Sequence, residues 1–331
     1  MPETSQHLRR LDGHVHLIGD GSCGDGCWLR LDSPRMRFQG RFLLRACGLG
    51  HLALKDPLDK PFREHLLSLI ETSSLDAVLL LAQDLPHDEQ GHALAEKAVF
   101  YVPNSAVLAL AKAHPEHIEP AVSIHPARPD AMDELEQCAA TGARVLKLLP
   151  NCLNVDCNKP AYRPFWERMA ALKMIFLAHT GGELSLPVIE PRFADPEILR
   201  GPLEAGVTVI AAHAAGRSAF FDTDYTQQLF AMMETYPNLY TDNSALSTVN
   251  RVHSAVKLLR SPWLSRVIHG SDFPIPVSAL GPRTYRLIDG QTRLKADAEQ
   301  NVLERDALLK AAMGFPAETF TRLDGLLQAN R

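Results

Sequence analysis

Asp76-Ala77-Val78-Leu79-Leu80-Leu81 is a short stretch in which one aspartate is followed by five consecutive apolar residues. It does not alternate between apolar and polar residues, as a strand with one solvent-exposed face does. Strands that are buried on both faces have this composition, and they occur in parallel sheets that are covered by helices. The stretch therefore predicts a parallel β-sheet with helices on its faces.

Seven more segments of similar length and character are spaced along the chain. These candidate strands are residues 11–17, 119–124, 143–149, 174–179, 207–213, 238–242 and 266–270. The stretches between them that have apolar residues at helical spacing are 60–73, 92–114, 130–141, 164–172, 196–205, 225–236 and 250–259. Eight strands alternating with helices predict an α/β fold, a (β/α)₈ TIM barrel, rather than an open doubly wound sheet, which is the structural alternative.

Two segments depart from this repeat. A long, glycine-rich and turn-rich loop covers about residues 18–61, and a second irregular stretch covers 273–294. In a barrel both lie at the carboxyl ends of the strands, where loops shape the pocket. We expect residues 1–331 to form one domain.

Composition excludes several classes of protein. The 331 residues include 34 Lys and Arg against 39 Asp and Glu, a formal net charge of −5, without a basic run. Nucleic acid and anionic membranes are therefore not expected partners. The polar N-terminus does not resemble a signal peptide, which predicts a cytoplasmic protein. No G-x-G-x-x-G motif follows the first strand, and no pair of acids at strand ends suggests a sugar-processing barrel.

Polar residues that bind metals recur at the ends of the predicted strands. His14 and His16 are two positions apart in the first strand, so both side chains point to the same face. His179, His213 and Asp272 each follow an apolar strand and precede turn residues. A polar residue that caps a strand explains any one of them alone. Four histidines and a carboxylate in this pattern instead suit zinc, manganese or iron.

These motifs resemble, in order, those of the amidohydrolase superfamily, in its amidohydrolase-related branch. The matching segments are Asp-Gly-His14-Val-His16, Ala-His179-Thr-Gly-Gly, Ala-Ala-His213-Ala-Ala-Gly and His-Gly-Ser-Asp272-Phe-Pro. The branch includes hydrolases, lactonases and non-oxidative decarboxylases of the aminocarboxymuconate-semialdehyde type. The resemblance spans residues 11–274, most of the chain.

The resemblance implies a barrel enzyme with one or two divalent ions at its mouth. His14, His16, His179 and Asp272 would be metal ligands, with zinc the expected metal and manganese or iron as alternatives. Asp272 would also transfer protons during catalysis, and His213 would orient or polarise the reacting group. We expect hydrolysis of a carboxylic ester, lactone or amide in a small molecule. A decarboxylase of the same family and a non-catalytic binding barrel are the alternatives. The hydrophobic content of 46% permits a homodimer without requiring one.

Lys147 and a few loop residues are further candidates. Lys147 lies on the fourth predicted strand, where related enzymes with two metal ions carry a carbamylated lysine that bridges the ions. Under that interpretation His213 is a ligand of the second ion; otherwise Lys147 is a buried, paired lysine. Arg217 and Asn243 are candidate substrate-binding residues, and Glu183 lies close enough to His179 in sequence to reach the pocket rim.

Overall fold

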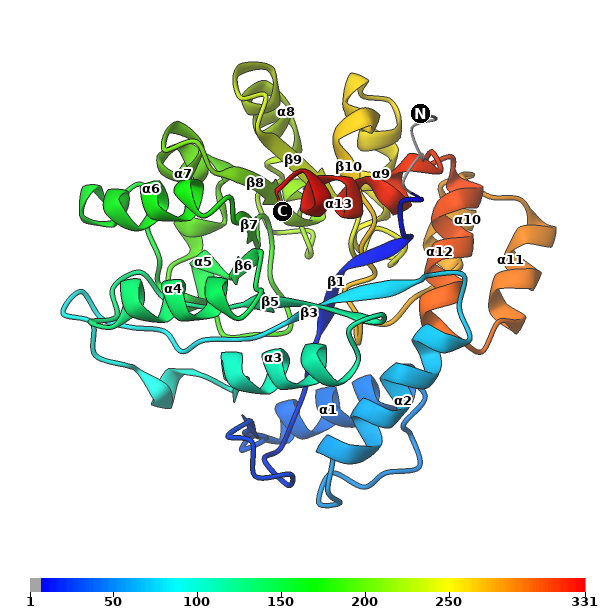
Figure 1. Ribbon diagram of the computed structural model, residues 1–331. Helices are drawn as coiled ribbons and strands as arrows, with labels where there is room; N and C mark the ends of the chain where they lie inside the picture. Colours follow the sequence, from blue (N-terminus) through cyan, green and yellow to red (C-terminus); the bar gives the residue numbers. More distant parts are fainter. Residues whose placement is uncertain (1–6, 331) are drawn as a thin grey trace, which may run out of the picture.

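The computed structural model describes residues 7–330 and contains an eight-stranded sheet in which all the strand pairs are parallel (Figure 1). Neighbouring strands follow the order of the chain: β1 (Leu11–His16), β3 (Ala77–Leu81), β5 (Ile118–Val122), β6 (Val145–Leu148), β7 (Ile175–Ala178), β8 (Thr208–Ala211), β9 (Leu239–Asp242) and β10 (Val267–Ile268). The predicted strands and the predicted TIM barrel are confirmed, and the strand bounds differ only at the ends.

The two edge strands, β1 and β10, close the sheet into a barrel. The Gly13 amide donates to the His269 carbonyl at 2.8 Å, and the His16 amide donates to the Phe273 carbonyl at 2.8 Å. In the opposite direction, the Asp272 amide donates to the His14 carbonyl at 2.9 Å. The hydrogen bonds that close the barrel therefore also bring the first-strand histidines beside Asp272.

Helices surround the ring of strands (Figure 1). Those that follow the predicted pattern are α2 (Asp59–Glu71), α3 (Asn104–Ala113), α4 (Ala131–Ala140), α6 (Arg163–Ala171), α7 (Arg200–Glu204), α8 (Thr226–Thr235) and α9 (Val252–Leu259). A short helix, α5 (Pro150–Leu153), follows β6. At the C-terminal end, α12 (Val302–Met313) and α13 (Glu318–Ala329) complete the covering layer, and α13 contacts β1 and β10.

Three sequence-based expectations need correction. The first long loop is not built from turns alone, because it contains β2 (Trp28–Leu29) and a helix, α1 (Pro34–Ala46). The stretch 273–294 contains α10 (Leu280–Thr284) and the start of α11 (Gly290–Ala298). Only the second half of the predicted helix 92–114 forms an α-helix, α3, while the first half has one short 3₁₀ turn, Ala95–Lys97.

The first half of the range 92–114 contains a short strand instead of an α-helix. Its strand β4 (Phe100–Tyr101) pairs antiparallel with β2, which ties the first loop to the body of the protein. Pro103 follows β4 and has an extended backbone at the start of α3. Proline has no amide hydrogen and its ring clashes with the preceding turn, so a helix cannot run through this position.

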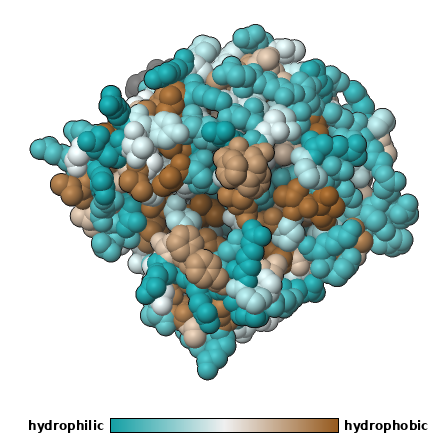
Figure 2. Space-filling model, turned by 180° about the vertical axis from the view of Figure 1, so that it is seen from behind, coloured by the Kyte–Doolittle hydropathy of each residue, from teal (hydrophilic) through white to brown (hydrophobic). Residues whose placement is uncertain are grey.

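Hydrophobic side chains gather on one face of the molecule around a hollow near its centre, seen from behind the view of Figure 1 (Figure 2). Large exposed apolar residues include Phe38 and Phe42 of α1 and the neighbouring pair Phe220 and Phe221.

None of the helices in the described part of the chain is long and apolar enough to span a membrane.

Because β1 packs closely against the segment after β10, we expect that Gly13 cannot be replaced by a residue with a side chain without a loss of stability. A Cβ atom added there would lie 2.9 Å from the His269 carbonyl oxygen and 3.1 Å from Leu323. Gly13→Ala should therefore lower the free energy of unfolding by about 1–3 kcal/mol, the usual cost of overpacking, in a denaturation experiment.

Gly290→Ala provides the matched control, because a Cβ at this position, at the start of α11, meets nothing within 4 Å. This variant should be at least as stable as the parent chain. Equal stability of the two variants would contradict the proposed tight contact between β1 and β10.

Candidate metal centre

The first strand directs both of its histidines to the same carboxylate. Nε2 of His14 lies 3.4 Å from Oδ1 of Asp272, and Nε2 of His16 lies 3.3 Å from the same oxygen. His14 is completely buried, whereas His16 is only partly buried. These three side chains lie close enough together to bind one metal ion.

Asp272 adopts an unusual backbone conformation directly after β10. Its φ is +68°, in the left-handed region that non-glycine residues seldom adopt. Burial alone would raise the pKa of Asp272, but His14 and His16 hold it well below the ordinary aspartate value. The side chain is therefore a carboxylate at neutral pH, the form that binds a metal ion.

The ends of β7 and β8 bring the other two histidines together. Nε2 of His213 lies 3.2 Å from Nδ1 of His179, and the two ring centroids are 4.9 Å apart. The turn after β8 is tight, since His213, Ala214 and Ala215 all have positive φ values of 60°, 51° and 49°. Such conformations are costly and are often found at functional sites.

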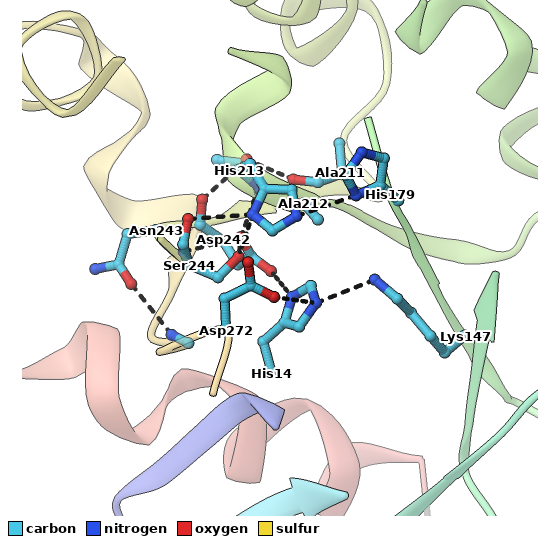
Figure 3. A network of polar contacts seen from close by, with 12 residues as sticks. His14, Lys147, His179, Ala211, Ala212, His213, Asp242, Asn243, Ser244 and Asp272 are labelled. Carbon is cyan, nitrogen blue, oxygen red and sulfur yellow. Dashed lines mark hydrogen bonds and ion pairs between the residues drawn. The ribbon is translucent and has the colours of Figure 1, made fainter. Parts of the chain in front are cut away.

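Asp242, at the end of β9, lies behind this cluster and holds it (Figure 3). Nδ1 of His14 donates to one oxygen of Asp242 at 2.8 Å. The other oxygen accepts from the His213 amide at 2.7 Å, from the Ser244 amide at 3.0 Å and from the Ser244 hydroxyl. A single buried carboxylate therefore anchors two histidines directly.

The partners of these side chains determine which ring nitrogens carry hydrogens. Nδ1 of His213 faces the Ser244 carbonyl at 3.1 Å, so this nitrogen must donate. Nε2 of His213 is then an acceptor for the Nδ1 hydrogen of His179. As a result, Nε2 of His179 is unprotonated and has a free lone pair, as a metal ligand requires, while Nε2 of His14 is unprotonated and faces the amine of Lys147.

The environment also keeps these imidazoles neutral. Burial, together with the nearby Lys147 ammonium, lowers the pKa of His14 to about 4. Burial lowers the pKa values of His179 and His213 well below the ordinary histidine value. Nε2 of His179 has no hydrogen-bond partner within residues 7–330, and the oxygen Oε2 of Glu183 lies 3.6 Å away. A buried nitrogen with a free lone pair is what an incoming metal ion would satisfy.

Lys147, on β6, points at the same cluster. Its Nζ lies 3.2 Å from Nε2 of His14, and the residue is completely buried. Burial lowers the pKa of Lys147 to about 8. The geometry therefore places Lys147 beside the candidate ligands, while its modification and a second ion remain predictions.

A cavity of about 410 Å³ opens beside these residues and is lined by His16, His179, His213 and Asp272, with Glu183 nearby. Within the described part of the chain, the lining residues do not include Arg217 or Asn243. Oδ1 of Asn243 instead accepts from the Gly270 amide at 3.1 Å, which links β9 to the segment before Asp272. Substrate binding by Arg217 and Asn243 stays a prediction.

Two buried charged residues near the centre, Asp242 and Arg251, are not among the residues predicted from the sequence. Asp242 satisfies the same criterion as the other candidates, a polar side chain at a strand end, and that signal could have identified it. Arg251 is 6% exposed and donates to the carbonyls of Gly182 and Gly216, so it fixes the loops that follow β7 and β8. No sequence motif identifies this role, because it depends on the packing of distant loops.

The network predicts that Asp242 controls metal affinity through histidine orientation. In Asp242→Asn one of the two oxygens becomes an amide nitrogen, which cannot accept from His14 or from the donors on the other side. We expect metal affinity to fall about 10- to 100-fold in a competition titration with a chelator, as for other residues that orient metal ligands.

Asp224→Asn is the matched control, because Asp224 also faces a histidine, with 3.2 Å between its Oδ2 and Nε2 of His253. Asp224 has no contact with the four candidate histidines among the hydrogen bonds and ion pairs of the described residues. A folded Asp242→Asn protein with the same affinity as this control would contradict the orienting role.

Comparison with solved structures gives matches to other barrels at low sequence identity. An uncharacterised TIM-barrel protein from Bordetella bronchiseptica has a TM-score of 0.62 at 16% identity, covering 97% of this chain and 100% of the other. The 2,6-dihydroxybenzoate decarboxylase from Rhizobium has a TM-score of 0.52 at 13% identity, covering 98% and 100%. The 5-carboxyvanillate decarboxylase from Sphingomonas paucimobilis has a TM-score of 0.50 at 14% identity, covering 95% and 99%. These likenesses establish the fold.

The sequence itself identifies the family. No curated protein matches the sequence significantly. The family model described as amidohydrolase, however, matches residues 68–306, which is most of the 331-residue chain. The match includes three of the four strand ends that carry the candidate ligands, and the first-strand pair His14 and His16 precedes it. The chain therefore belongs to the amidohydrolase family.

Proposed function

We propose that this protein is a metal-dependent hydrolase that cleaves a carboxylic ester, lactone or amide bond in a small molecule. The observation that carries the proposal is the position of Asp272. Its carboxylate faces His14 and His16 and also lines the cavity, so it can contact both a bound ion and a substrate.

The proposed ligands of a single ion are His14, His16, His179 and Asp272. The free lone pair of His179, the unprotonated Nε2 of His14 and the carboxylate of Asp272 fit a divalent metal. Zinc suits this nitrogen-rich set, with manganese or iron as alternatives. A structure of 5-carboxyvanillate decarboxylase from Novosphingobium aromaticivorans contains bound manganese. When bound, such an ion polarises a carbonyl group and lowers the pKa of water.

The protein's own groups would move the proton. The attacking water gives one proton to Asp272 as its oxygen bonds to the carbonyl carbon. Asp272 then passes that proton to the leaving oxygen or nitrogen as the carbon–heteroatom bond breaks, so one water yields an acid and an alcohol or amine. His213, which lines the same cavity, would contact the reacting group, and Asp242 would keep His213 in position.

Decarboxylation is the second candidate function, supported by the fold shared with decarboxylases of aromatic acids. It requires a group that holds the substrate's carboxylate. Among the described residues that line the cavity, Arg30 is the one with a cationic side chain, and its guanidinium lies over Trp28 and donates to the Ala95 carbonyl. A bound ion and the buried cations Lys147 and Arg251 would add positive charge beside the cavity, so the assays below decide between the two reactions. A non-catalytic binding barrel would be favoured if the protein did not bind divalent metals.

Parallel assays of the metal-loaded protein distinguish the two reactions. We expect acid release from a panel of esters, lactones and anilides, and no release of carbon dioxide from hydroxybenzoates. Asp272→Asn should lower kcat by about 10²- to 10⁴-fold, the usual contribution of a proton-transferring group. Asp224→Asn again serves as the control, and carbon dioxide release without acid formation would reject hydrolysis.

The number of ions is a separate prediction. We propose one ion per chain with an unmodified Lys147, because the amine of Lys147 lies 3.2 Å from a nitrogen that the ion would use. Elemental analysis should then give about one metal per chain, and intact mass should show no carbon dioxide adduct. Two ions per chain together with such an adduct would instead support a bridging, carbamylated Lys147 with His213 as a ligand.

A further inference from the structure

The helix α1 in the first long loop forms one wall of the cavity. Ser33 caps the helix, since its hydroxyl accepts from the Met36 amide at 3.1 Å, and Pro34 occupies the first turn. The residues that face the cavity recur at helical spacing along one stripe: Met36, Gln39, Gly40, Leu43, Leu44 and, just past the helix, Cys47. The helix is therefore amphipathic, and its apolar side faces an open space.

This helix lacks the burial that normally stabilises an amphipathic helix. None of the described residues of α1 is buried, although Leu43 and Leu44 are partly covered. On its other face, Phe38 and Phe42 are 71% and 54% exposed. An apolar stripe is usually buried against a protein core, so a stripe that lines a cavity indicates that something else packs against it.

The opposite wall is also apolar. It comes from the barrel side and includes Phe62 of α2, Phe100 of β4, Leu149 after β6, and Ile275 after β10. The volume of about 410 Å³ falls within the range of roughly 300–1,000 Å³ that is typical of small-molecule pockets. The candidate metal centre lies in the same cavity, so a molecule that reaches the centre also contacts these walls.

The charged groups of the cavity do not suit an anionic ligand. Its carboxylates are Asp20, Asp56, Glu183 and Asp272, and the lone cation among the described lining residues is Arg30. Arg30 is engaged, with its guanidinium 4.5 Å from the Trp28 ring centre and a hydrogen bond of 2.8 Å to the Ala95 carbonyl. Lys147 and Arg251 are buried beside the metal centre and are not among the lining residues, so an anionic group on the apolar part of a substrate would face these carboxylates without a free cation.

From these contacts we infer that the substrate is an electrically neutral ester, lactone or amide with an extended apolar part, which packs between α1 and the mouth of the barrel. The inference rests on the proposed hydrolysis for the reacting bond, and on the cavity walls for the apolar part. Specificity for chain length then resides in α1, while the bond-breaking residues remain on the strand ends.

A series of substrates tests the apolar part. The metal-loaded chain is assayed with ethyl acetate, ethyl butanoate, ethyl hexanoate and ethyl octanoate, and with monoethyl octanedioate, which ends in a carboxylate. We expect kcat/KM to rise about three- to fourfold per added methylene until the cavity is filled. The terminal carboxylate should remove this gain, and a preference for monoethyl octanedioate over ethyl octanoate would overturn the inference.

A binding series provides a measurement that does not depend on catalysis. Calorimetric titration of the metal-free chain with the primary alcohols butanol, hexanol and octanol should show a dissociation constant that falls by the same factor per methylene. Hydrolysis of ethyl acetate combined with no chain-length trend in either series would overturn the inference and leave the hydrolase proposal intact. A trend in alcohol binding without hydrolysis of any ester would support the apolar occupant and reject the proposed reaction.

Two adjacent residues of α1 provide a matched pair of variants. Leu43→Arg places a charge on the cavity wall and should weaken octanol binding by about tenfold or more. Phe42→Arg adds the same charge on the solvent face and should leave octanol binding unchanged. Equal effects of the two variants would overturn the role of the stripe. If Leu43→Arg does not fold, as judged by thermal melting, Leu43→Ala replaces it, with an expected loss of several-fold.

Discussion

One buried carboxylate, that of Asp242, determines the geometry of the candidate metal centre. It accepts from Nδ1 of His14, which is 228 positions away in sequence, and from the amide of His213. Through Ser244 it also fixes the ring of His213, which in turn accepts from His179. Because each hydrogen bond determines the next donor, this one carboxylate leaves Nε2 of His14 and Nε2 of His179 unprotonated. Both nitrogens therefore have the form that binds a metal before any ion arrives.

The contact between β1 and the segment after β10 closes the barrel and also positions the residues of the candidate metal centre. Oδ1 of Asp12 accepts from the amides of His14 and Ser271 at 3.0 and 2.8 Å, so it ties β1 to the segment after β10. Behind that segment, the buried Lys310 donates to the Gly270 carbonyl and pairs with Asp306 of α12. A buried pair of charges is weak evidence for stability, but it does fix position. The conformation of Asp272 is thus supported by elements on both sides of the closure.

The sequence predicts the barrel well because its signals are local. A run such as residues 77–81 is apolar on both faces, as in a parallel sheet covered by helices, and the alternation of eight such runs with helical segments selects that arrangement. The strand-end residues follow from the same reasoning, since the carboxyl ends of parallel strands share one edge. Local reasoning fails for 92–103, where pairing with β2 and Pro103 override helical spacing. It also misses α1, although Ser33 and Pro34 are ordinary helix-start signals, because Gly40 interrupts the apolar pattern.

The roles of Asp242 and α1 cannot be predicted from local sequence patterns. The role of Asp242 depends on distances between side chains on three strands, which no spacing along the chain reports. The role of α1 depends on what its stripe faces, and the sequence alone cannot distinguish a core from a cavity. An element with so little burial belongs to the least stable part of the fold. An apolar ligand would supply the missing contacts, so substrate binding and the ordering of α1 would stabilise each other, while the strand-end residues stay fixed by Asp242.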